Sequence, residues 1–384
     1  MPPPNLDDEF VALPVGQGDA FFLRRAEFTA LIDGGKSRYS FSELFGKTLG
    51  LGHVNVLVCT HNDDDHAKGI IGFLEGALAC DEVWLPDLWG DRLTDLLNIP
   101  AEFVEELAED VSKQRQSTLQ QIADELGKLP EEKTYPPAPE QGEFLELEQD
   151  PDHADNELWR YGPVVIASEH PRFMLFALEP LMLEAIQAAK RIREIAIAAA
   201  NRGLPIRWFR HSNACARGGK NQLRPLNSIE VARSYRKVSA LNYLALSVSN
   251  IFSLVYQSPS TDDQANVIFS ADSNLAFDAK INWGTRSIIT APHHGSEDNA
   301  NAYARFSRET NEETRAIWVR SDGKFNSRPG LSYLKQTEKY CTICRNASTS
   351  KQEVRFTSSN GSWMATKQTR PCNCWPVTGC AFRS

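Results

Sequence analysis

An apolar segment that runs directly into a cluster of ligand-type side chains is the feature that most constrains this sequence. Residues 54–58 (VNVLV) have the composition of a buried strand. The next nine residues, 59–67, read CTHNDDDHA and carry two histidines and three aspartates. Such crowding of carboxylates is unfavourable unless a cation or water compensates it. The run therefore predicts a metal site at the end of a strand, with an acidic loop that caps the next helix as the alternative reading.

Three further apolar segments end in the same kind of side chain. One ends at Asp33, one at Asp272, and one at a Pro-His-His-Gly-Ser turn at residues 292–296. In layered α/β proteins the strand ends carry the site, and the loops that follow them supply its chemistry. A single aspartate after a strand is an ordinary turn residue. Four such ends, two of them rich in histidine, predict one shared centre.

In these motifs and in their order the chain resembles the metallo-β-lactamase superfamily. It resembles more closely the hydrolase domain attached to ComEC-type (competence) DNA-uptake proteins and its stand-alone relatives. Two departures from that pattern are Ala271, where the family usually has glycine, and Arg328, where it often has histidine. The motifs are V-G-Q-G-D-A (15–20), L-I-D-G-G (31–35), T-H-x-D-x-D-H (60–66), N-I-F-S-L-V-Y (250–256), S-A-D (270–272) and P-H-H-G-S (292–296).

The resemblance implies an α/β protein with the four-layer αββα metallo-β-lactamase fold. Residues 1–89 would form the first half of the fold domain, and residues 204–340 the second half. Between them, residues 90–203 have the periodicity of a helical insertion with an acidic, Pro-rich linker at 130–157. This insertion either covers apolar surface or walls the substrate cleft. Residues 341–384 form a Cys-rich C-terminal tail.

Local patterns predict individual elements along the chain. Apolar periodicity indicates helices at 40–49, 100–127 and 181–202, the last ended by glycine and proline. Short apolar runs indicate strands, among them one at 82–85 and one at 241–248.

We expect the shared centre to hold two divalent ions, zinc or manganese. Asp272 is the natural bridge, because one carboxylate can give an oxygen to each metal. His294 matches the superfamily's histidine better than its neighbour does, so His293 would contact substrate oxygen or protonate the leaving group. Asp65 would act at the metal, and Asp33 would orient a ligand by a hydrogen bond. The expected ligands are His61, Asp63, Asp65, His66, Asp272 and His294.

Two points about this centre stay open in the sequence. The first metal lacks a clear third protein ligand, and His170 and His211 are candidates that more often would be surface histidines. Asp19 follows a glycine-rich turn, where a structural role and a catalytic role are equally consistent with the pattern.

Five of the eight cysteines fall within residues 341–384. Cys341 and Cys344 form a C-x2-C pair, and Cys372 and Cys374 form a C-x-C pair. In a reducing compartment such pairs indicate a structural zinc site rather than disulfides. An ordinary reduced tail and a redox-active pair are the alternatives, and Cys380 could replace one member of the second pair.

The net charge and composition limit which kinds of partner the chain is expected to bind. A net charge of −9 argues against broad adhesion to nucleic acid, although two metal ions would add positive charge where a phosphate would lie. The basic residues between 207 and 224 could follow a phosphate backbone or form a solvated loop. Residues 1–9 lack the features of a secretory signal, and no membrane-length apolar run exists. We expect a cytoplasmic protein without a membrane segment.

The resemblance implies a metal-dependent hydrolase that uses water activated by two metals. A phosphodiesterase, in particular a nuclease, is the leading hypothesis, with nucleic acid or another phosphodiester as substrate. A hydrolase of a small ester, phosphoester or lactam is the second, since the fold alone does not select among them. The third is a non-enzymatic module in which the metal is structural and another surface binds a protein partner.

Overall fold

A computed structural model gives the coordinates of this chain. It describes residues 8–113, 171–232, 239–247, 252–260, 265–344 and 351–374, except positions 111, 324, 326 and 360 and the side chains of residues 171–185, 244–247 and 359. The linker expected at 130–157, His170 and Cys380 lie outside the described residues.

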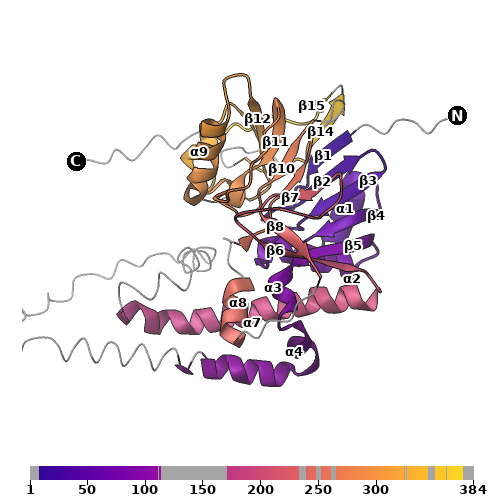
Figure 1. The fold of residues 1–384 in the computed structure, drawn as a ribbon. Coiled ribbons are helices and arrows are strands. Elements are labelled where there is room, and N and C mark those ends of the chain that lie inside the picture. Colours follow the sequence, from indigo (N-terminus) through magenta and orange to yellow (C-terminus); the bar gives the residue numbers. More distant parts are fainter. Residues whose placement is uncertain are drawn as a thin grey trace, which may run out of the picture.

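Two β-sheets face each other (Figure 1). Within the described residues, sheet 1 has nine strands in the order β15-β14-β1-β2-β3-β4-β5-β6-β8. β3, β4, β5 and β6 are parallel, so their carboxyl ends share one edge. The strands are β1 (Asp8–Ala12), β2 (Phe21–Arg25), β3 (Phe28–Ile32), β4 (His53–Val58), β5 (Ala79–Pro86), β6 (Ile206–His211), β8 (Ser228–Val231), β14 (Val354–Ser359) and β15 (Ser362–Ala365).

Sheet 2 has six described strands in the order β13-β12-β11-β10-β9-β7. β10, β11, β12 and β13 are parallel, so this sheet also gathers several carboxyl ends at one edge. The strands are β7 (Arg224–Pro225), β9 (Tyr256–Ser258), β10 (Val267–Phe269), β11 (Arg286–Thr290), β12 (Arg315–Arg320) and β13 (Glu338–Cys341).

Helices cover the outer face of each sheet, which gives the four-layer αββα architecture that the resemblance implied. On sheet 1 lie α1 (Phe41–Leu49), α2 (Asp64–Glu75), α3 (Asp87–Gly90), α4 (Leu93–Asn98), α7 (Pro171–Asn201) and α8 (Ala240–Ser247). On sheet 2 lie the short η2 (Pro292–Gly295) and η3 (Glu297–Asn299), α9 (Ala300–Glu309) and α10 (Leu331–Leu334). Figure 1 shows α9 and α7 on opposite sides of the paired sheets.

Apolar side chains fill three layers between these elements. The inter-sheet layer includes Phe10 and Phe269, whose ring centroids are 6.1 Å apart. The layer between sheet 1 and its helices brings Phe45 of α1 to 5.6 Å from Phe73 of α2. On the outer face of sheet 2, α9 packs through Tyr303. Burial on both faces explains why most strands read as continuous apolar runs rather than as alternating ones.

One local prediction is wrong. Residues 241–248 were expected to form a strand, but α8 occupies Ala240–Ser247. Short apolar runs do not distinguish a strand from a buried helix, and the leucines and alanines of this run favour a helix. Its Tyr243 is buried and donates a hydrogen bond from its hydroxyl to the carbonyl of Trp89 at 2.7 Å. The helices expected at 40–49 and 181–202 are confirmed by α1 and α7.

The C-terminal region is part of sheet 1. β14 pairs antiparallel with β1, and β15 pairs with β14. The tail that the cysteine pattern defined therefore contributes two strands to the fold. In the parts of the chain that the structure describes, no helix combines the length and apolar character needed to cross a bilayer.

Candidate metal centre

The candidate site lies where the strand ends of the two sheets converge. From sheet 1, Asp33 follows β3, and residues 59–67 follow β4 and lead into α2. From sheet 2, Asp272 follows β10 and the histidine turn, residues 292–296, follows β11. All four segments that the sequence singled out thus meet at the same edge of the fold.

Asp272 lies at the centre of this group, and its two oxygens face different histidines. Oδ1 is 3.2 Å from Nε2 of His66 and 3.8 Å from Nε2 of His294. Oδ2 is 3.5 Å from Nε2 of His61 and 3.6 Å from Nε2 of His293. The neighbouring histidines of the turn therefore face separate oxygens of one carboxylate. This is the placement that a bridging ligand requires.

The first donor set surrounds Oδ1 of Asp272. Nε2 of His66 and Nε2 of His294 are 3.3 Å apart, and Oδ2 of Asp65 is 3.2 Å from the latter nitrogen. Ligand atoms of Asp19, His66, Asp272 and His294 all lie within 4.8 Å of one another. Imidazole nitrogens and carboxylate oxygens in one buried cluster can hold a zinc or manganese ion.

The second donor set surrounds Oδ2 of Asp272. Ligand atoms of His61, Asp63 and Asp272 lie within 4.8 Å of one another. Nε2 of His61 is 3.8 Å from Oδ2 of Asp63. His293 contributes its Nε2 on the same side, and its side chain keeps 19% of its surface exposed. This set therefore lies nearer the solvent than the first.

Two buried carboxylates orient the histidines of the first set. Oδ2 of Asp33 is 2.8 Å from Nδ1 of His66, and the same carboxylate accepts hydrogen bonds from the backbone and hydroxyl of Thr60 at 2.8 and 2.7 Å. Oδ1 of Asp19 is 3.0 Å from Nδ1 of His294. Each contact leaves Nε2 of the ring directed into the cluster, as ligand-orienting carboxylates do in metal sites.

The charges of the cluster favour positive charge on the histidines. Burial lowers the pKa of His66, but Asp272 and Asp33 outweigh burial and raise that pKa well above its ordinary value. At His294 burial again lowers the pKa, but Asp19 and Asp272 outweigh burial and raise that pKa well above the usual range. Because only the neutral imidazole binds a metal, cation binding at this set would release protons.

The second set has a different electrostatic character. Burial lowers the pKa of His293, which keeps its imidazole neutral at neutral pH and able to bind a cation. Burial raises the pKa of Asp63 to about 6. At Asp272 burial is outweighed by the histidines, first by His293 and then by His66, so its pKa lies well below the ordinary value. A cation here would stabilise the ionised form of Asp63.

Two buried polar atoms test whether the residues fit a metal pair. Nε2 of His61 and Oδ2 of Asp19 are buried and have no hydrogen-bond partner among the described residues. An unsatisfied buried polar atom costs about 1–3 kcal/mol, so each requires an explanation. One atom belongs to each donor set, and both are of the kind that bind zinc or manganese. The residues present therefore fit two divalent cations.

The histidine turn is held in an uncommon backbone conformation. His293 and His294 have φ of 46° and 51°, a region that residues other than glycine rarely occupy. The backbone N–H of His293 donates to the carbonyl of Ala271 at 2.9 Å, and Nε of Arg320 donates to the carbonyl of His294 at 2.7 Å. Backbone strain of this kind persists where the surrounding structure fixes it, and it concentrates at functional sites.

Close backbone contacts explain the glycines of the first motifs. Gly18 has φ of 87°, and a Cβ there would come within 1.7 Å of the carbonyl oxygen of Asp65. A Cβ on Gly69 of α2 would come within 1.8 Å of the carbonyl oxygen of Gly34. Without side chains at these positions, the first turn of α2 packs directly against the loops that carry Asp19 and Asp33.

Helix α7 contacts the loop between His61 and Asp63. In α7, Nε of Arg191 donates to the carbonyl of Asn62 at 2.8 Å. In return, the side-chain amide of Asn62 donates to the carbonyl of Ala188 at 2.9 Å. α7 therefore supports the loop that carries His61 and Asp63 as well as covering the apolar face of α2.

All of the expected ligands lie in the cluster, although their individual roles remain predictions. His211, an alternative ligand, lies apart on β6 with its ring 5.1 Å from Phe252. Sequence reasoning left Asp19 open and missed Asn299, whose amide donates to the carbonyl of Asp272 at 3.0 Å and whose oxygen is 3.2 Å from Nδ1 of His293. The glycine-bounded motif around Asp19 was the available signal for that residue. Asn299 had none.

Fold and site together define a four-layer αββα protein with a candidate two-metal centre. A solved structure described as hydrolase AbOPH in the beta lactamase superfamily is similar to this chain at 10% identity and a TM-score of 0.33, covering 83% of this chain and 74% of that one. A likeness at this level carries no inference about chemistry. No protein-family model matches the sequence, and no curated protein is similar to it.

Proposed function

We propose that this protein is a metal-dependent hydrolase of the metallo-β-lactamase type, with two divalent cations, zinc or manganese, held on either side of Asp272. The observation that carries the proposal is the division of the Asp272 carboxylate, whose Oδ1 faces His66 and His294 while Oδ2 faces His61 and His293. A structural metal site needs one closed donor set. Two sets that share one carboxylate are the arrangement of two-metal hydrolases.

Two cations bound there would acidify water and neutralise the negative charge that develops on a phosphoryl or carbonyl oxygen. The protein's own residues then have distinct tasks. Asp33 and Asp19 hold the rings of His66 and His294 so that Nε2 points inward. His293, partly exposed and held by Asn299, has the position to contact a substrate oxygen or to exchange a proton with the leaving group.

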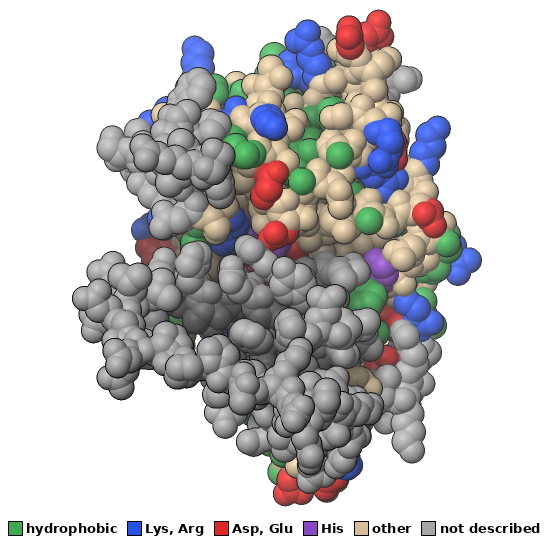
Figure 2. Space-filling view, turned by 90° about the vertical axis from the view of Figure 1, so that its left-hand side faces the viewer, with side chains coloured by type: hydrophobic (Ala, Val, Ile, Leu, Met, Phe, Trp, Pro, Cys, Tyr) green, Lys and Arg blue, Asp and Glu red, His purple; other side chains and the backbone are tan. Residues whose placement is uncertain are grey.

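A phosphodiester is the substrate class that we favour, and the ComEC-type resemblance makes nucleic acid the first candidate. The chain's surface gives limited support to an extended duplex. Among the described residues on the face shown in Figure 2, Lys and Arg side chains are dispersed rather than gathered in a continuous stripe. In the basic segment 207–224, Arg207 binds Glu230 and Arg210 binds Asp87 at 2.8 Å. A small diester or a single strand reaching the centre needs less basic surface than a duplex does.

We also infer that residues 90–203 are an insertion that takes part in the site. Arg191 of α7 donates to the carbonyl of Asn62, and the Asn62 amide donates to the carbonyl of Ala188 of α7. These reciprocal hydrogen bonds support a role in the site rather than coverage of apolar surface alone. Hydrolysis of a small ester or lactam remains the second candidate function, since the same donor sets would serve a carbonyl carbon. The third, a module that binds a protein partner around a structural metal, requires that no turnover occurs.

The test is a substrate panel on purified, metal-loaded protein. Zinc- and manganese-loaded protein would be assayed against single- and double-stranded DNA, RNA, bis-(p-nitrophenyl) phosphate, a p-nitrophenyl ester and a β-lactam. We expect cleavage of the small phosphodiester and of at least one polymer. Ester or lactam turnover alone would favour the second function, and no turnover at all would favour the third.

A matched pair of variants links the activity to the centre. Asp272→Asn keeps the shape of the bridging side chain but removes its charge, so we expect loss of turnover and of metal from both sets. Asp81→Asn changes an exposed aspartate that binds His53 far from the cluster, and should leave activity intact. Turnover retained by metal-loaded Asp272→Asn would contradict the proposal.

A further inference from the structure

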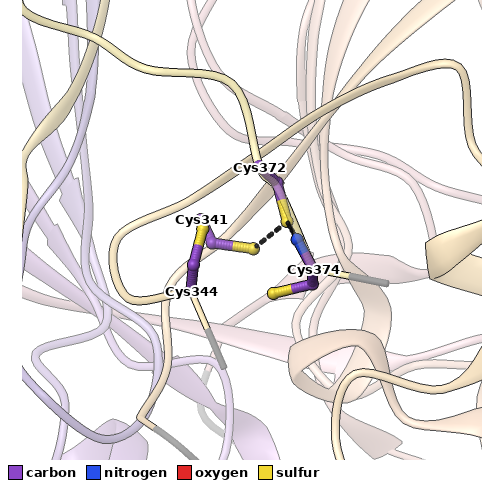
Figure 3. Close-up of side chains that lie close together, drawn as sticks. All are labelled: Cys341, Cys344, Cys372 and Cys374. Carbon is purple, nitrogen blue, oxygen red and sulfur yellow. Dashed lines mark hydrogen bonds between the residues drawn. The ribbon is translucent and has the colours of Figure 1, made fainter. Parts of the chain in front are cut away.

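Four cysteines converge at the edge of sheet 2, away from the His/Asp centre. Cys341 ends β13 and Cys344 follows it, whereas Cys372 and Cys374 follow β15 (Figure 3). Their four sulfur atoms lie within 4.8 Å of one another. Figure 3 shows the side chains of both pairs directed toward a common point. The two motifs that the sequence singled out thus meet in space, and we call these four residues the cysteine cluster.

The spacing of the sulfurs excludes disulfide bonding in this structure. Sγ of Cys341 and Sγ of Cys372 are 3.0 Å apart, whereas a disulfide bond measures about 2.05 Å. None of the four cysteines forms a disulfide bond. A tetrahedral zinc–thiolate site with bonds of about 2.3 Å would separate its sulfurs by about 3.8 Å. That separation lies inside the 4.8 Å limit within which the cysteine cluster falls.

The surroundings of the cysteine cluster suit a negatively charged metal–thiolate group. The backbone N–H of Cys374 donates toward Sγ of Cys372 at 3.4 Å. The hydroxyl of Tyr333 lies 3.2 Å from Sγ of Cys341. The guanidinium of Arg320 is fully buried beside the cysteine cluster and donates to the carbonyl of Ile343, between the two cysteines of the first pair, at 3.2 Å. These donors and this cation would offset the charge of four thiolates.

We propose that the cysteine cluster binds one zinc ion that fastens the segment after β15 to the end of β13. Residues 366–374 form no helix or strand and are held by separate hydrogen bonds to Lys339, Gln352 and Arg355. Those contacts include the N–H of Cys372 to the carbonyl of Lys339 at 2.7 Å. The amide of Gln352 also donates to the carbonyls of Cys341 and Arg370, at 2.9 and 3.0 Å. A four-coordinate metal would add a link between segments about thirty residues apart, which is how closed zinc sites stabilise small folds.

The same zinc would support the histidine turn through Arg320. This guanidinium donates from Nη1 to Ile343 in the first cysteine pair and from Nε to His294 in the turn. Loosening the cysteine pair would therefore disturb a side chain that holds the His/Asp centre. The zinc site itself does not depend on the proposed function, because its four ligands lie outside that centre.

The experiment measures metal in a background where the His/Asp centre cannot contribute. The chain carrying His61→Ala, His66→Ala and Asp272→Asn, so that both donor sets lose ligands, would be purified in reducing buffer and its zinc counted by elemental analysis. We expect about one zinc per chain. Replacing zinc with cobalt should give the thiolate charge-transfer and visible bands of a tetrahedral cobalt site. Titration with a thiol reagent should show four cysteines that react only after the metal is displaced.

Matched cysteine variants assign the metal to the cysteine cluster. In the same background, Cys344→Ser and Cys372→Ser should each abolish the zinc and the cobalt bands, whereas Cys215→Ser, which alters an exposed cysteine outside the cysteine cluster, should change neither. Absence of metal with all thiols reactive, bound iron with its visible colour, or a disulfide found by mass spectrometry would each overturn the proposal. The cobalt and thiol measurements decide the matter even where a serine variant fails to fold.

Discussion

Nε of Arg320 donates a hydrogen bond to the carbonyl oxygen of His294 at 2.7 Å, and the rest of the same guanidinium binds groups on two other segments. Its Nη2 donates to Asp322 and to the carbonyl of Gly323, at 2.8 and 2.9 Å. Its Nη1 reaches the carbonyl of Ile343. A planar fork can satisfy so many acceptors at once, and an ammonium group cannot.

Arg320→Lys should therefore destabilise the protein. Several hydrogen bonds from a buried charged group are lost, and each contributes about 1.5–3 kcal/mol, so we expect the free energy of unfolding to fall by about 3 kcal/mol or more. Denaturant unfolding measures the change. Arg286→Lys is the control, because Arg286 binds Glu338 at the surface and should lose less than about 1 kcal/mol. Equal losses in the two variants would contradict the assigned importance of Arg320.

Asp33→Asn should weaken metal binding without removing a metal ligand. The asparagine keeps the shape of the side chain but loses the charge that holds Nδ1 of His66. Loss of such an orienting carboxylate typically lowers metal affinity about 10–100-fold. Titration of apoprotein with zinc or manganese in a competing chelator gives the affinity. If Asp33→Asn bound metal as tightly as Asp81→Asn, the orienting role would be wrong.

The pH dependence of stability should differ between metal-free and metal-loaded protein. The folded-state pKa values of His66 and His294 are raised by neighbouring carboxylates. A histidine whose pKa is raised by folding stabilises the fold fully below its unfolded-state pKa of about 6.5. This stabilisation is lost as the pH rises through the folded-state pKa. Metal-free protein should therefore melt at progressively lower temperature above neutral pH. Bound cations replace the protons on the histidines, so the melting temperature of the metal-loaded protein should not fall in this way.

Thermal melting between about pH 6 and about pH 9, with and without added metal, checks this dependence. His294→Gln should flatten the alkaline loss of stability in the metal-free protein. His53→Gln, which changes an exposed histidine bound to Asp81, should keep the wild-type profile. A melting temperature of the metal-free protein that rises with pH would reverse the predicted sign.

Substitutions at Ala271 should depend strongly on side-chain shape. This residue precedes Asp272 and has φ of 46°, which costs an L-residue about 1–2 kcal/mol. Glycine relieves that strain but adds freedom to the unfolded chain, so Ala271→Gly should change stability by less than about 1 kcal/mol. Ala271→Val places a β-branched side chain in the same region and should cost about 2 kcal/mol or more. Equal stability of the two variants would show that the backbone is not constrained there.

The His/Asp cluster was predictable because its residues lie at strand ends. His61, Asp63 and His66 follow one apolar run within a few positions, so local order alone marks them. Asp272 and His294 are far away in sequence but follow strands of the same kind. What local order cannot give is which oxygen faces which imidazole, because that depends on how the two sheets pack. The sequence alone therefore does not show that Oδ2 of Asp272 faces His61 while Oδ1 faces His66.

Elements without a strong period were less predictable. α8 was misread because a short, mostly apolar run fits a buried strand as well as a helix. Asn299 carries no motif, and its contact with His293 depends on the turn that folds η3 back over the site. The cysteine pairs were recognisable from their spacing, whereas the pairing of the two C-terminal strands with β1 was not, since antiparallel partners need no fixed separation in the chain.

That pairing has a consequence for how the molecule is made. Arg355 of β14 binds Glu9 of β1 across 346 residues. On the ribosome, β1 therefore emerges long before its outer neighbour does. Until β14 emerges, the β1 edge of sheet 1 exposes unpaired backbone N–H and C=O groups that can pair with another nascent chain. Truncated products that end before β14 should therefore aggregate, and chaperone demand during biosynthesis should fall only when β14 and β15 arrive.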